Sequence, residues 1–104
     1  MYLCGPMTGY PAFNYPAFFA AADALRVARL EPLNPAELGD KLGSAPWATY
    51  MRCAIAMLVK AEAVVMLDGW AQSRGALLER QIADAVQIPV YSSVAMVAAA
   101  YSGE

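Results

Sequence analysis

The segment from Ala63 to Leu67 constrains the fold more than any other part of this sequence, because it reads AVVML without a polar residue. A short apolar run rich in β-branched residues is typical of a strand buried on both faces. Such strands occur in parallel sheets that are covered by helices on both sides. We therefore expect this segment at the centre of a parallel sheet.

Short apolar runs and helical periodicities alternate along the rest of the chain. Strands are expected at 2–4, 30–33, 63–67 and 88–91, and helices at 16–29, 47–61, 76–87 and 94–101. Pro32 lacks an amide hydrogen, which places 30–33 at a sheet edge. This alternation predicts an α/β fold with right-handed crossovers. We expect one domain over residues 1–104, a flavodoxin-like or Rossmann-like three-layer sandwich around a four-stranded, or at most five-stranded, parallel sheet.

Charge and composition exclude several classes of function. A formal net charge of −2 argues against a nucleic-acid partner, which needs a basic face. The chain has no histidine, so Ser-His-Asp and Cys-His catalysis and histidine-containing metal sites are excluded. We expect neither a metal nor a cofactor.

The balance of apolar and charged residues predicts association. Charged residues make up 15% of the chain and hydrophobic residues 60%, whereas about 25% of a typical soluble domain is charged. A small domain cannot bury that much apolar surface, so we expect a homodimer or a higher homo-oligomer. Candidate interface regions are Trp70 and residues 94–101.

The sequence gives no sign of a membrane segment or a secretory signal. The longest apolar run, 53–67, is interrupted by Lys60 and Glu62 and is shorter than the roughly 20 residues that a membrane span needs. The N-terminal residues contain no basic region ahead of an apolar one, so a cytoplasmic location is expected. There Cys4 and Cys53 stay reduced.

Three loops follow the expected strands, and one of them carries an anion-binding pattern. Ligands of parallel sheets bind outside the carboxyl ends of the strands, which directs attention to residues 5–15, 34–47 and 68–75. In the last loop, Ser73 and Arg74 precede Gly75 at the start of a helix, where free backbone amides attract an anion. The alternative is that Ser73 is only a helix cap and Arg74 a solvated charge.

Glu79 is the candidate for covalent chemistry. At helical spacing it shares a side with Ala76, Ile82 and Ala83, which belong to the apolar stripe. A carboxylate held there can attack an electrophilic carbon. It can equally be a structural acid that complements the helix dipole and pairs with a nearby arginine.

Aromatic residues are concentrated in or beside the three loops. Their rings could stack on a base, or they could belong to the core, as aromatic residues of a small apolar domain more often do. They are Tyr2, Tyr10, Tyr15, Trp47, Tyr50 and Trp70.

Five segments together resemble a known family over residues 2–90. They are YLCGPMTG from Tyr2, LNP from Leu33, WATYMR from Trp47, AVVMLDGW from Ala63 and SRGALLE from Ser73. The family consists of small bacterial and phage domains of unassigned function that are similar to the nucleoside 2-deoxyribosyltransferases.

The resemblance implies an activity and a set of site residues. Glu79 would attack the anomeric carbon of a nucleoside and Tyr2 would orient it, by the carboxylate logic of retaining glycosidases. Ser73 and Gly75 would stand where relatives that hydrolyse nucleoside 5′-monophosphates hold the phosphate. The expected substrate-binding residues are Gly5, Pro6, Met7, Asn34, Trp70, Ser73, Arg74 and Gly75.

One departure from the family keeps two functions open. Ala54 aligns with an aspartate that assists the leaving base in many relatives. The expected function is therefore an enzyme that cleaves or transfers the N-glycosidic bond of a nucleoside or nucleoside 5′-monophosphate through a Glu79 glycosyl intermediate. The alternative is a nucleotide-binding module without turnover.

Overall fold

The computed structural model describes residues 1–102, with the side chains of residues 40 and 41 left aside, so the last two residues of the expected domain lie outside it. Three parallel strands form the sheet: β1 (Tyr2–Cys4), β2 (Val64–Met66) and β3 (Val90–Tyr91). Their order is β1-β2-β3, with Tyr2 opposite Val64 and Val64 opposite Val90. The central position predicted for the segment around Val65 is thus confirmed.

The predicted flavodoxin-like or Rossmann-like sandwich with four or five strands is wrong, because the sheet of the described residues has three strands. Residues 30–33 contribute only an isolated bridge between Leu33 and Tyr2. Pro32 cannot donate a ladder hydrogen bond, and after Leu33 the chain turns at once into a 3₁₀ turn, Pro35–Glu37. Two prolines in four residues therefore leave too little backbone for a strand.

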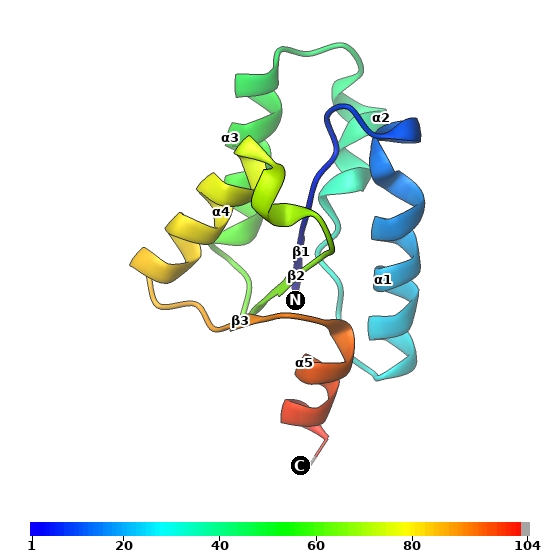
Figure 1. Ribbon diagram of the computed structural model, residues 1–104, viewed down its shortest axis with the longest axis vertical. Helices are drawn as coiled ribbons and strands as arrows, with labels where there is room; N and C mark the ends of the chain where they lie inside the picture. Colours follow the sequence, from blue (N-terminus) through cyan, green and yellow to red (C-terminus); the bar gives the residue numbers. More distant parts are fainter. Residues whose placement is uncertain (103–104) are drawn as a thin grey trace.

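The described residues form five α-helices (Figure 1). They are α1 (Tyr15–Val27), α2 (Leu38–Leu42), α3 (Trp47–Leu58), α4 (Arg74–Ala85) and α5 (Val94–Tyr101). Of these, α1, α3, α4 and α5 pack on the sheet, while α2 packs against the Pro35–Glu37 turn and α3. The helix expected at 94–101 is confirmed, and those expected at 16–29, 47–61 and 76–87 are found with ends that differ by at most three residues. None of the helices in residues 1–102 is long and apolar enough to cross a membrane.

Two apolar clusters hold the helices on opposite faces of the sheet. Leu3 and Val65 pack with Phe18 of α1 and Val97 of α5 on one face. The other cluster contains Tyr2, Cys4, Val64 and Met66 of the sheet, together with Leu58 of α3 and Ala76 and Ala83 of α4. Because side chains alternate along a strand, Tyr2 and Cys4 point together toward α4. This alternation places two polar atoms of β1 beside the helix that carries Glu79.

Candidate active site

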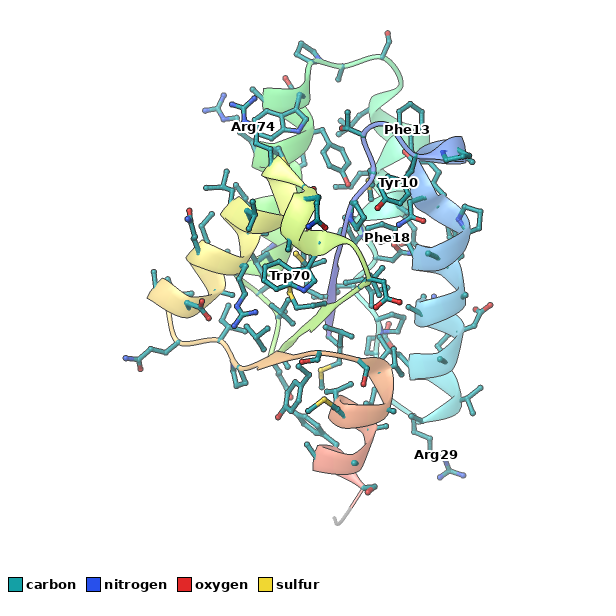
Figure 2. The ribbon with its side chains drawn as sticks, in the orientation of Figure 1. Tyr10, Phe13, Phe18, Arg29, Trp70 and Arg74 are labelled. Atoms are coloured by element: carbon teal, nitrogen blue, oxygen red, sulfur yellow. The ribbon has the colours of Figure 1, made fainter. Side chains whose placement is uncertain are left out.

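A cavity of about 770 Å³ lies at the carboxyl end of β1. Its walls come from the loop after β1, the start of α1, residues 35, 39 and 42–45, the first turns of α3 and the first half of α4. In Figure 2, Tyr10 and Phe13 lie on the α1 side of this region and Arg74 on the side of α3 and α4. The volume is in the range of pockets that bind small molecules.

The path of the chain explains why the cavity forms at this strand. β1 lies between Leu33 on one side and β2 on the other. The segments that follow β1 and β2 consequently diverge, and a crevice opens between them at the carboxyl end of the sheet. Two of the three predicted loops, 5–15 and 34–47, contribute several residues each to the wall, and the third contributes its last residues, 72–75.

Glu79 lies in the wall of the cavity and is almost completely buried, with 6% of its surface exposed. It sits on the inner face of α4 with Ala76 and Ala83. Its Oε2 accepts a hydrogen bond from the Tyr2 hydroxyl, and its Oε1 lies 3.6 Å from the Cys4 thiol. The two oxygens of the carboxyl group are thus held by two side chains of the same strand.

Burial sets the protonation of this cluster. Desolvation raises the pKa of Glu79 to about 7, against the hydrogen bonds from Tyr2 and Cys4, which lower it. Burial and the neighbouring Glu79 charge raise the pKa of Tyr2 well above its ordinary value, and they raise the pKa of Cys4 as well. Tyr2 therefore keeps its proton and acts as a donor, while Glu79 becomes a carboxylate near neutral pH.

The start of α4 forms another part of the wall. Ser73 caps the helix, because its Oγ accepts a hydrogen bond from the Ala76 amide at 3.2 Å. The guanidinium of Arg74 lies over the Trp47 ring at 4.2 Å. A Cβ on Gly75 would come within 3.3 Å of the Met51 sulfur, so glycine lets α4 pack closely on α3.

The structure brings most of the expected site residues together. Glu79 and six of the eight expected binding residues line the cavity, namely Gly5, Pro6, Met7, Ser73, Arg74 and Gly75. Tyr2 is buried behind the wall and reaches Glu79 through its hydroxyl.

Asn34 and Trp70 are not among the residues that line the cavity. The Asn34 side chain is buried and turns back to accept a hydrogen bond from the Ala36 amide at 3.0 Å. Trp70 begins a 3₁₀ turn, packs on the cluster that contains Tyr2 and lies under the Arg80 guanidinium at 5.3 Å. Ala54, in α3, is fully buried and also lies outside the wall.

The structure gives defined contacts to Tyr50, which the sequence placed only among the aromatic residues beside the loops, and it adds lining residues that spacing did not single out. Tyr50 donates to the Met7 sulfur at 3.0 Å and lies 3.4 Å from the Pro35 carbonyl oxygen, which joins α3 to two loops. Burial, with a smaller contribution from the Glu79 charge, raises the pKa of Tyr50. Its place beside a ligand loop was the available signal. Further lining residues that were not singled out are Phe13, Phe18, Met51 and Gln72.

The arrangement fits carboxylate chemistry. An ionised Glu79 can attack a carbon or stabilise a developing positive charge, because burial strengthens its electrostatic interactions. The residues that the structure describes contain no cluster of three or more side chains suited to hold a metal ion.

Comparison with known proteins gives a family without an assigned function. The family model described as "Domain of unknown function (DUF4406)" matches residues 1–92. No curated protein and no solved structure matches the chain.

Proposed function

Because the chain belongs to the DUF4406 family, whose function is unknown, we propose an activity from the site itself. The protein cleaves or transfers the N-glycosidic bond of a nucleoside, a deoxynucleoside or a nucleoside 5′-monophosphate, with Glu79 as the nucleophile. The observation that carries the proposal is the buried Glu79 carboxyl in the wall of a ligand-sized cavity, held by Tyr2.

The reaction runs in two displacements at the anomeric carbon. In the first, an oxygen of ionised Glu79 bonds to C1′, the C1′–N bond breaks and its electron pair leaves with the base. In the second, water or the nitrogen of another base attacks C1′, and Glu79 is released as a carboxylate. Water gives up one proton, which the departed base takes up, and yields a free sugar. The nitrogen of a second base loses its proton in the same way and yields a new nucleoside.

The cavity that Glu79 lines offers groups that can bind the base and the phosphate of a nucleotide. Aromatic rings in the wall can stack on a base. Arg74 and the amides at the start of α4, beside Gly75, can hold a 5′-phosphate. Tyr2 keeps the carboxyl oriented while it stays protonated itself.

Base release tests this function directly. The purified chain is incubated at pH 8 with a panel of nucleosides and nucleoside 5′-monophosphates, and free base is measured by chromatography. We expect release by the natural chain and a loss of at least about 10³-fold in Glu79→Gln, because the nucleophile is removed. Glu62→Gln, which removes an exposed acid, is the matched control. Absence of release, or equal release by Glu79→Gln, would exclude the proposal.

The second candidate function is a nucleotide-binding module without turnover. Ala54 stands where the resemblance expects an aspartate that assists the leaving base, and among the lining residues with described side chains Glu79 is the one carboxyl. In this case a nucleotide raises the melting temperature of the protein but no base is released.

We also propose that the chain works as a homo-oligomer in the cytoplasm. Large apolar side chains stay exposed on several helices and on the turn after α4, including Val27, Val86 and Met96, which are 85%, 55% and 53% exposed. A partner chain that covered them would remove this surface from water. Light scattering coupled to gel filtration should give at least twice the mass of one chain, and a monomer would contradict the proposal.

A further inference from the structure

We infer that the base released at this site is a cationic heterocycle, which leaves the sugar as a neutral molecule without taking up a proton. The inference rests on the proposed function and names the class of substrate that the cavity takes. Its basis is the chemistry of the groups around Glu79 and along the cavity wall.

The groups that face Glu79 carry no positive charge. From β1, the Tyr2 hydroxyl donates to Oε2 and the Cys4 thiol lies 3.6 Å from Oε1. From α3, Tyr50 lines the same cavity, and because its pKa is raised it stays a neutral phenol. Both ion pairs recorded within residues 1–102 lie elsewhere and leave Glu79 out. An ionised Glu79 therefore has no ion-pair partner among the described residues, and the one cation whose charge acts on this cluster is Arg80, which opposes the rise that burial causes in the pKa of the neighbouring Cys4.

The two arginines of α4 contact groups other than Glu79, and Arg74 keeps the positive charge that can hold a 5′-phosphate, because stacking on a ring does not neutralise it. Arg74 stacks on Trp47 at 4.2 Å, and Arg80 pairs with Asp84 at 3.2 Å while it lies over Trp70 at 5.3 Å. In Figure 2, Arg74 lies at the start of α4, and Tyr10 and Phe13 lie toward α1 on the other side of the view. A cationic ligand can therefore offset the Glu79 charge.

Several aromatic rings line the same cavity as Glu79. Tyr10, Phe13, Tyr15, Trp47 and Tyr50 all line the cavity. The face of an aromatic ring attracts a cation, and the attraction is strongest where water is excluded. A flat, positively charged heterocycle is complementary to such walls both in shape and in charge.

The way in which the base leaves the sugar also favours a cationic base. A neutral base leaves readily only if an acid protonates it. Among lining residues whose side chains are described, Glu79 is the one carboxyl, and it is already used as the nucleophile. The raised pKa of Tyr50 makes its hydroxyl a poor acid near neutral pH.

A cationic base removes the need for that acid. The Glu79 oxygen bonds to C1′, the C1′–N bond breaks, and its electron pair neutralises the positive ring. No proton moves in this step. Water then attacks C1′, the bond between C1′ and Glu79 breaks to return the carboxylate, and the water loses one proton to the solvent as the sugar is released. Ribosides of pyridinium rings and of N7-alkylated purines share this property.

A matched pair of nucleotides tests the inference. Guanosine 5′-monophosphate and 7-methylguanosine 5′-monophosphate differ by one methyl group and one positive charge, and nicotinamide mononucleotide represents the pyridinium source. We expect kcat/KM for at least one cationic substrate to exceed that for guanosine 5′-monophosphate by about 10²- to 10⁴-fold, which is the usual effect of general acid catalysis. Which of the two cationic substrates is cleaved shows whether the released base is an N7-alkylated purine or a pyridinium ring.

Two outcomes separate this inference from the proposed function. If guanosine 5′-monophosphate is cleaved within tenfold of both cationic substrates, the inference fails and the function stands. If no nucleotide releases its base, the function fails.

A binding measurement decides the charge preference without any turnover. The cation 1-methylnicotinamide and neutral nicotinamide are titrated at pH 8 into the natural chain, Glu79→Gln and Glu62→Gln. We expect the cation to bind at least tenfold more tightly to the natural chain and to Glu62→Gln, with the preference lost in Glu79→Gln. Equal binding of the two probes to the natural chain would overturn the inference.

Discussion

The Glu79→Gln variant is expected to be more stable than the natural chain by about 3 kcal/mol at pH 8, and nearly equal to it at pH 4. The reason is that the pKa of Glu79 is about 7 in the folded protein, against an ordinary value of 4.5. Each unit of pKa difference corresponds to about 1.36 kcal/mol. Glutamine keeps a side-chain oxygen that can accept the Tyr2 hydrogen bond, and it carries no charge to desolvate.

The direction in which stability changes with pH follows from the number of protons bound by the folded and the unfolded chain. Between about pH 4.5 and pH 7 the folded chain keeps the Glu79 proton while the unfolded chain has lost it, so stability falls as the pH rises. Below this window both states are protonated and the contribution vanishes. Above it the full destabilisation is present, because the folded chain then holds a buried carboxylate.

Urea unfolding followed by tryptophan fluorescence measures the effect at both pH values. A difference of this size raises the melting temperature by roughly 10 °C or more in a domain of about 100 residues. Glu62→Gln serves as the control, since that exposed acid should change the stability little at either pH. If the difference in the free energy of unfolding between Glu79→Gln and the natural chain were the same at pH 4 and pH 8, burial would not shift the pKa of this carboxyl.

The secondary structure that rests on local pattern could be predicted from the sequence. The run around Val65 gave the central strand, and apolar periodicity gave α1, α3, α4 and α5. The prediction of a strand at 30–33 was wrong because a strand forms only where enough backbone groups make hydrogen bonds to a neighbouring strand. Pro32 was recognised as an edge residue, but together with Pro35 it leaves one bridged residue, Leu33.

The sequence predicted those parts of the candidate site whose position follows from the backbone topology. It did not predict the direction of a side chain that can contact either the cavity or neighbouring residues. Glu79 was singled out from its place on the apolar stripe of a helix, and it is buried there. Asn34 and Trp70 also follow the expected strands, but one caps a 3₁₀ turn and the other packs under Arg80. The directions of these two side chains depend on tertiary contacts, which cannot be deduced from the spacing of residues along the sequence.

The Tyr2→Phe variant is expected to lose about 10- to 100-fold of its base-release activity at pH 7 and to recover part of it at higher pH. Removal of the hydroxyl takes away the donor to Oε2, which stabilises the ionised form of Glu79. Hydrogen bonds to charged groups contribute about 1.5–3 kcal/mol, so the pKa of Glu79 should rise by about 1 to 2. The phenylalanine ring can keep the packing of Tyr2 in its cluster.

Carbon-13 NMR of the Glu79 carboxyl measures this rise even where no substrate is turned over. Tyr50→Phe is the matched control, because its hydroxyl bonds to Met7 and Pro35 and makes no hydrogen bond to Glu79. If Tyr2→Phe and Tyr50→Phe titrate like the natural chain, Tyr2 does not set the ionisation of Glu79. A rise in Tyr2→Phe alone would show that a strand residue 77 positions earlier in the chain keeps this buried acid available as a nucleophile near neutral pH.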